Sequence, residues 1–135
     1  MATRDSTSHA DVVESVRPQV ATADVEGETV DLRGSDSVLF AVTVGAITGG
    51  NGDSVVTIEE SEDDSTFTDV ADTDILGSEP TLAANTAYQF GYIGTARYVR
   101  GKFGIGTETD AAVSVVAVRT HLHSEPDGYN VESVI

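Results

Sequence analysis

Ser37-Val-Leu-Phe-Ala-Val-Thr-Val44 is the stretch of this sequence that decides its fold. Side chains alternate between the two faces of an extended strand. On one face they are all apolar: Val38, Phe40, Val42 and Val44. Leu39 and Ala41 point to the other face, so both faces carry apolar residues. This pattern predicts a central strand that is covered on both sides.

The sequence on either side contains further short alternating runs, bounded by Gly, Asn, Asp and Pro. With the first stretch, the segments expected to form strands are residues 19–23, 29–32, 37–44, 54–60, 66–70, 88–92, 96–103 and 112–118. Residues 45–52 are rich in Gly and Asn and are expected to form a loop. About eight strands with turn signals between them predict an all-β fold, an antiparallel β-sandwich or jelly roll.

The ends of the chain do not follow this alternation. We expect an N-terminal arm over residues 1–17, a β-sandwich domain over residues 18–120 and an extended C-terminal tail over residues 121–135. In the arm, three valines lie at helical spacing: Val12, Val13 and Val16. A helix of this length is too short to be stable alone, so we expect it to pack on the domain or on a neighbour.

Composition limits the possible classes of protein. The 135 residues suit a single domain with a core of its own, and the absence of cysteine excludes a disulfide framework and any cysteine-ligated zinc or redox site. The first ten residues are polar, unlike a signal peptide, and no apolar run is long enough to span a membrane. We therefore expect a soluble protein with no membrane partner.

Charge is the strongest compositional signal. The formal net charge is −16, and Lys102 is the only lysine. A field of this sign repels phosphate backbones, so we expect no nucleic-acid partner. Many aspartates, little lysine and a core of small residues are typical of proteins from salt-loving organisms, in which salt screens the repulsion. An ordinary acidic surface is the alternative.

Basic side chains gather on one expected strand, residues 96–103. Alternation places Tyr98, Arg100 and Lys102 on its outward face. Two interpretations stay open. The three residues pair with carboxylates of the neighbouring strand at residues 54–60, or they form a contact patch, since Tyr and Arg are common anchors at interfaces. Together with Val12, Val13 and Val16, they are our candidate interface residues.

Patterns for catalysis and cofactor binding are weak. Gly101-Lys-Phe-Gly-Ile-Gly106 lacks the spacing of a phosphate-binding loop. His121 and His123 with Glu125 and Asp127 are a possible metal site, but strand-end histidines are more often polar surface. The acidic residues at 62–64, 69, 72 and 74 lack the spacing of a calcium loop. No nucleophile elbow or singled-out carboxylate pair is present, so we expect neither an enzyme nor a cofactor.

Three segments carry a family resemblance. Thr57-Ile-Glu-Glu-Ser-Glu-Asp-Asp-Ser-Thr-Phe-Thr-Asp-Val70 and the later Ala96-Arg-Tyr-Val-Arg100 resemble two signatures of discoidin-like jelly rolls. With Asp31-Leu-Arg-Gly-Ser-Asp-Ser-Val38 before them and Gly91-Tyr-Ile-Gly ahead of the last signature, they resemble small head-associated proteins of tailed viruses. The resemblance covers roughly residues 30–103.

The residues of these segments suggest structural roles. We expect residues 61–65 to form a polar turn, and Phe67 and Tyr98 to close the sandwich between its sheets. Arg97 or Arg100 is expected to hold a loop carboxylate through a bidentate contact.

The resemblance implies a virion protein, made in the host cytoplasm and placed on the capsid surface, either a decoration (cement) protein or the base of a vertex turret or spike. Its implied partners are the major capsid protein, copies of itself and a spike or fibre protein. The alternative is a carbohydrate-binding module of a virion or cell-surface appendage, because discoidin-like domains bind sugars or lipids through exposed loop aromatics. This chain has no tryptophan, and its loop at residues 45–52 offers only Ile47.

Overall fold

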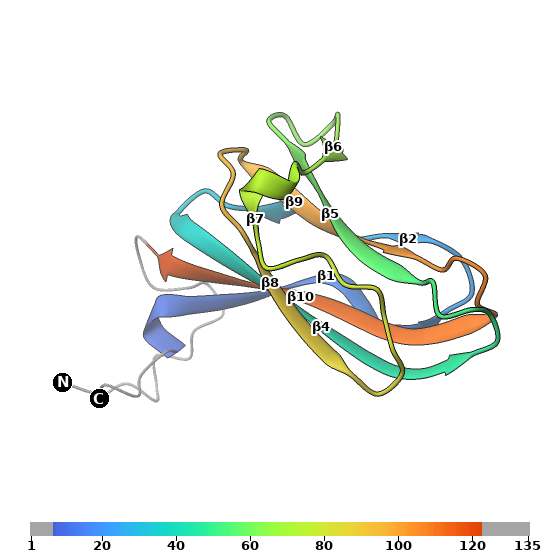
Figure 1. Cartoon of the computed structure of the whole chain (residues 1–135). Helices are drawn as coiled ribbons and strands as arrows, with labels where there is room; N and C mark the ends of the chain where they lie inside the picture. Colours follow the sequence, from blue (N-terminus) through green and yellow to red (C-terminus); the bar gives the residue numbers. More distant parts are fainter. Residues whose placement is uncertain (1–6, 123–135) are drawn as a thin grey trace.

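The computed structural model describes residues 7–122, which form two antiparallel sheets that face each other (Figure 1). Sheet A has the strand order β1-β10-β4-β8-β7, and sheet B has the order β2-β9-β5-β6, with β3 also paired to β9. The strands are β1 (Ala10–Ala21), β2 (Val25–Glu26), β3 (Val30–Asp31), β4 (Ser35–Thr48), β5 (Val55–Ser61), β6 (Thr68–Asp69), β7 (Ile75–Leu76), β8 (Ala87–Tyr92), β9 (Tyr98–Gly104) and β10 (Asp110–Leu122). Two 3-10 turns complete the described chain, η1 (Thr7–His9) and η2 (Asp72–Asp74). The predicted antiparallel β-sandwich is confirmed.

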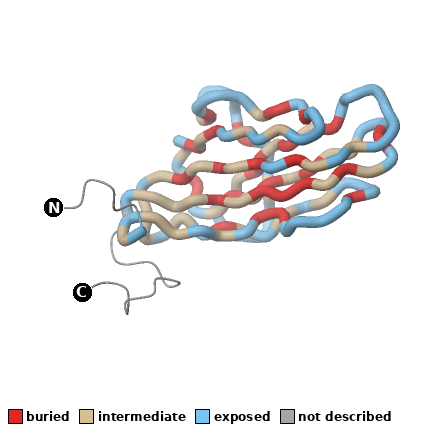
Figure 2. Tube along the Cα trace, turned by 90° about the horizontal axis from the view of Figure 1, so that it is seen from below, coloured by how far each residue is buried: buried red, intermediate tan, exposed pale blue. Residues whose placement is uncertain are grey.

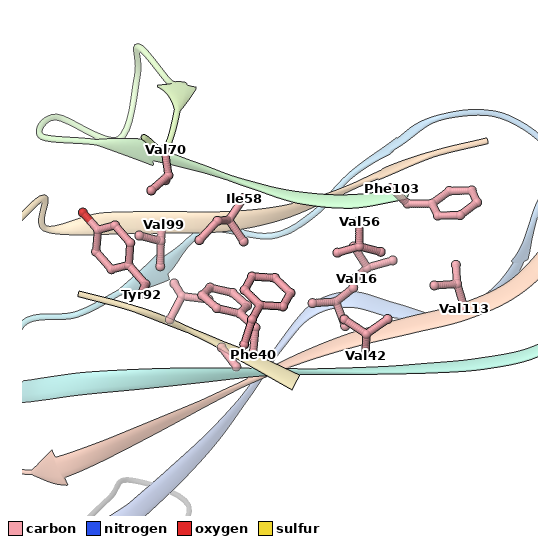
Figure 3. Packing of buried hydrophobic residues seen from close by; sticks show 14 of the residues in the cluster. Val16, Phe40, Val42, Val56, Ile58, Val70, Tyr92, Val99, Phe103 and Val113 are labelled. Carbon is pink, nitrogen blue, oxygen red and sulfur yellow. The ribbon is translucent and has the colours of Figure 1, made fainter. Parts of the chain in front are cut away.

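The core lies between the sheets. Figure 2 shows that the buried residues lie along the middle parts of the strands. Figure 3 shows the two sheets contributing facing side chains, Val16, Phe40, Val42 and Val113 from sheet A and Val56, Ile58, Val99 and Phe103 from sheet B. Phe40 and Phe90, opposite each other on β4 and β8, stack with ring centroids 5.5 Å apart. The residues that alternate inward on β4 therefore build the centre of the core, as the sequence predicts.

The N-terminal segment differs from the expectation. Residues 10–21 form β1, the edge strand of sheet A, so the predicted helix around Val12 to Val16 is wrong. β-branched valines fit a strand better than a helix, and pairing with β10 determines the outcome. Pro18 lies where the β1–β10 register shifts, a position that tolerates a residue without an N–H donor. Residues 10–17 thus belong to the sandwich and not to an arm.

Ser15 explains how β1 joins the second sheet. Its hydroxyl accepts a hydrogen bond from the backbone N–H of Gly101 at 2.7 Å and donates one to the carbonyl of Glu28 at 3.0 Å. The Ser15 carbonyl in turn accepts a bond from the Glu28 N–H. Gly27 is required beside it, because a Cβ there would lie 2.6 Å from the Gly101 carbonyl. This corner ties the edge of sheet A to sheet B.

Two further boundaries need correction. β4 continues to Thr48, so the loop expected at residues 45–52 begins only after it, at Gly49 and Gly50, which both have positive φ. β10 continues to Leu122, so residues 121–122 belong to the sheet, and the rest of the expected tail, residues 123–135, lies outside the described residues. No helix in residues 7–122 has the length and apolar character needed to cross a membrane.

Candidate functional site

The basic row on β9 lies on the outer face of sheet B. Its register with β5 sets Tyr98 opposite Ser61, Arg100 opposite Glu59 and Lys102 opposite Thr57. On the other side of β9, Lys102 faces Glu26 of β2. All three β9 side chains are half-buried. Their outward direction agrees with the alternation read from the sequence.

Arg100 is held within this face. Its guanidinium lies 2.9 Å from Glu59 Oε1 and 3.6 Å from Glu26 Oε2, and it stacks 3.9 Å over the ring of Phe67. Only 19% of the Arg100 side chain is exposed. The cross-strand pairing interpretation therefore holds for Arg100. Most of the Arg100 side chain is therefore inaccessible to an outside partner.

Arg97 joins two segments of the family resemblance. Its Nε and Nη2 donate to the two carboxylate oxygens of Asp31 at 3.1 and 2.9 Å, and its guanidinium lies 4.8 Å from the ring of Tyr98. The hydrogen bonds from Arg97 lower the pKa of the Asp31 carboxyl. The Leu32 N–H also donates to the Arg97 carbonyl at 2.8 Å. The expected bidentate contact forms at Arg97.

Residues 61–65, within the resembling segment at residues 57–70, form the expected polar turn. Asp63 Oδ1 accepts hydrogen bonds from the N–H groups of Thr66 and Ser65 and from the Ser61 hydroxyl. These bonds lower the pKa of the Asp63 carboxyl, the Thr66 bond most of all. Asp64 has a φ of 60°, which an aspartate adopts more readily than most residues. The turn is thus held by its own side chains.

The aromatic residues are placed differently from the prediction. Phe67 and Tyr98 lie on the outer side of sheet B and do not close the sandwich. Tyr92 takes that position, with 3% of its surface exposed. Its hydroxyl donates to Glu60 Oε1 at 2.6 Å and accepts from the Ala96 N–H at 3.0 Å. Burial and the bond to Glu60 raise the pKa of Tyr92, so its hydroxyl stays protonated.

The acidic residues around the polar turn border an open hollow of about 340 Å³, which Glu60, Asp63 and Asp74 line in part. Among residues 7–122, no three His, Cys, Asp or Glu side chains are grouped as metal ligands. His121 Nδ1 lies 2.6 Å from the Ser37 hydroxyl, and His123 lies outside the described residues.

Glu79 leads to a first prediction. Its carboxylate accepts a 2.6 Å bond from the Ile58 N–H, but desolvation, together with Asp72 and Asp69, raises its pKa. The folded state therefore favours the protonated Glu79 carboxyl, and this contribution to stability is lost as pH rises through the folded-state pKa. We expect Glu79→Gln to raise stability at neutral pH by about a few tenths of a kcal/mol, since screening is large, and the gain should vanish in acid. Melting curves against pH, with Glu62→Gln as the exposed control, test this; equal gains in both variants would contradict it.

The three N-terminal valines are placed in different surroundings. Val16 has 0% of its surface exposed and belongs to the core, so it leaves the candidate interface. Val13 is partly buried against the same core. Val12 is 66% exposed and points to the outer face of sheet A.

The outer face of sheet A carries apolar side chains that sequence reasoning did not assign to an interface. A row of directly paired residues crosses all five strands: Val12, Val118, Leu39, Gly91 and Leu76. Leu76 is 58% exposed and Leu39 is half-buried. The prediction that β4 is covered on both sides is therefore wrong within the described chain. The outward Leu39 and Ala41 were the available signal for an open apolar face.

With the geometry known, comparison with known proteins adds one likeness. No protein-family model matches the sequence, and no curated protein matches it. One solved structure that is similar is a prophage-derived protein. It is the SPBc2 prophage-derived protein YomS, with a TM-score of 0.48 and 17% identity, over 81% of this chain and 94% of that one. Nothing about the function of this chain follows from a likeness of this size.

Proposed function

We propose that this chain is a non-enzymatic structural protein of a tailed virus, attached to the outer surface of the capsid as a decoration protein or as the base of a turret or spike. One observation carries the proposal. The segments at residues 31–38 and 96–100, which hold the sequence resemblance to head-associated viral proteins, meet in space through the Asp31–Arg97 pair and the β3–β9 pairing. The resemblance thus corresponds to one structural unit of the sandwich.

The roles of the motif residues also favour a structural protein. Asp31, Asp63, Arg97 and Arg100 all make contacts that hold loops or strands together. The proposal includes a salt-loving source, supported by the net charge of −16 and the single lysine. Salt screens repulsion between such acidic copies, which lets many weak contacts on a particle act together.

Fractionation of a lysate from the source culture tests the proposal. We expect the protein to sediment with intact heads in molar salt, and immunogold labelling to mark the outer surface of these heads. A protein found only in the soluble fraction, with unlabelled heads, would overturn the proposal. So would binding on a glycan array by a protein that never sediments with heads.

Truncation then locates the attachment. Because β1 begins at Ala10 and β10 ends at Leu122, deletions restricted to residues 2–9 or 123–135 leave every described strand intact. We expect one of these two variants to lose head association while its melting temperature stays within a few degrees of the full chain. Retained association in both would place the contact on the sandwich itself.

A further inference from the structure

The exposed apolar side chains of the described chain share one surface, the outer face of sheet A. The large hydrophobic residues that are more than half exposed are Val12, Val20, Leu76 and Ile93. Val12 and Leu76 end the paired row described above, and Val20 lies opposite the outward Ala112. Ile93 follows the inward Tyr92 at the end of β8, so alternation turns it outward. Their grouping on one face is unlike the scattered exposure that is normal on a monomer.

This face is also poor in charge. The outer sides of β10, β4 and β8 carry two ionisable side chains, Asp110 at the start of β10 and His121, which contacts the outward Ser37. The edge strand β1 adds Glu14 and the exposed Arg17. The outer face of sheet B, in contrast, has a carboxylate on β5, Glu59, beside the cations Arg100 and Lys102 on β9. With a net charge of −16, two copies repel each other in most orientations. The outer face of sheet A is where copies approach with least repulsion.

The outer face of sheet A is uneven along its strands. Near one end, the row from Val12 to Leu76 stands out from the sheet. Toward the other end of the long strands lies an open hollow of about 490 Å³, where Gly45 and Ala112 leave room between Val20 and Thr43. In an isologous two-fold dimer the same patch of each copy meets the other, so a row at one end of the strands can face a hollow at the other end.

We propose that a second copy of this chain packs on the outer face of sheet A, sheet against sheet, with the Val12–Leu76 row of each copy seated in the partner's hollow. β1, β10 and β4 are 12, 13 and 14 residues long. At about 3.3 Å per residue and 4.8 Å between strands, these strands and β8 present roughly 700 Å² per copy. A standard specific interface buries about 800 Å² per partner. This inference does not depend on attachment to a capsid.

Sedimentation velocity of the full chain tests the proposal, in dilute buffer and in molar KCl. We expect dimers or higher oligomers whose association strengthens with salt. Val12→Glu/Leu76→Glu should weaken association by about 100-fold or more, because each carboxylate would be buried in an apolar contact. Both positions are more than half exposed in the single chain, so circular dichroism should show unchanged folding.

Two matched variants separate the effect of the outer face of sheet A on association from the effect of net charge. Ala23→Glu/Asn51→Glu adds the same charge at exposed loop positions and should associate as the wild type does. Val12→Lys/Leu76→Lys lowers the net negative charge and should still lose association, since a buried ammonium is also unfavourable. A wild type that is monomeric in molar KCl overturns the proposal, and so does wild-type association in the two face variants. Sedimentation with heads is measured separately from self-association. A failure of the proposed dimer therefore neither supports nor overturns the proposed function.

Discussion

Phe40→Ala is expected to destabilise the domain by about 3–5 kcal/mol, the usual cost of removing a buried phenylalanine. Phe40 has 0% of its surface exposed, stacks on Phe90 and is flanked on β4 by Val38 and Val42, both buried. Its loss leaves a cavity at the centre of the sandwich (Figure 3). Because whole domains are stable by only about 5–15 kcal/mol, the midpoint of guanidinium unfolding should fall by a large fraction.

Phe67→Ala is the matched control, since it removes the same atoms from the outer side of sheet B. There the ring loses its contact with the Arg100 guanidinium, which is worth about 1 kcal/mol. A loss at Phe67 as large as that at Phe40 would contradict the assignment of the core. Equal slopes of the unfolding curves are needed for the comparison, because a changed slope signals a changed denatured state.

The second large effect is expected for Tyr92→Phe, a loss of about 1–3 kcal/mol from a change of one oxygen atom. The hydroxyl of Tyr92 is both a donor to Glu60 and an acceptor for the buried N–H of Ala96. Phenylalanine leaves both partners without this oxygen in a poorly solvated place. Urea unfolding at neutral pH measures the loss.

Tyr88→Phe provides the comparison. Its hydroxyl accepts one bond, from the Ala83 N–H at 2.9 Å, at an exposed position. Water replaces that partner, so we expect a change within about 0.5 kcal/mol. A double-mutant cycle of Tyr92→Phe with Glu60→Gln isolates the interaction energy between the Tyr92 and Glu60 side chains. If Tyr92→Phe costs no more than Tyr88→Phe, the hydroxyl does not join the two sheets as described.

The sequence predicts the sandwich well because period-two alternation records which side of a strand is buried. Ser37 to Val44 shows this clearly, and each of the eight expected strands has its counterpart. Four strands have only two residues, too few to define a period: β3 and β6 lie within expected segments, whereas β2 and β7 were not expected. The helical spacing of the valines from Val12 to Val16 also gives the wrong prediction, because pairing with the distant β10 makes this segment a strand.

The candidate surfaces were predictable to different degrees. The outward direction of Arg100 follows from alternation, but its partners Glu59, Glu26 and Phe67 depend on register and on a loop, which one sequence does not fix. Leu39 and Ala41 indicated a second apolar face on β4. Only the strand order shows that this face continues from β1 to β7 and stays uncovered by residues 7–122.

The position of β10 between β1 and β4 has a consequence for biosynthesis. The last described strand, β10, is the only described neighbour of β1 in sheet A, so β1 leaves the ribosome long before its partner does. Until residues 110–122 emerge, β1 and one side of β4 are open edges that invite pairing with other nascent chains. Folding of sheet A is therefore completed only after residues 110–122 are made, and its many distant pairings favour slow folding.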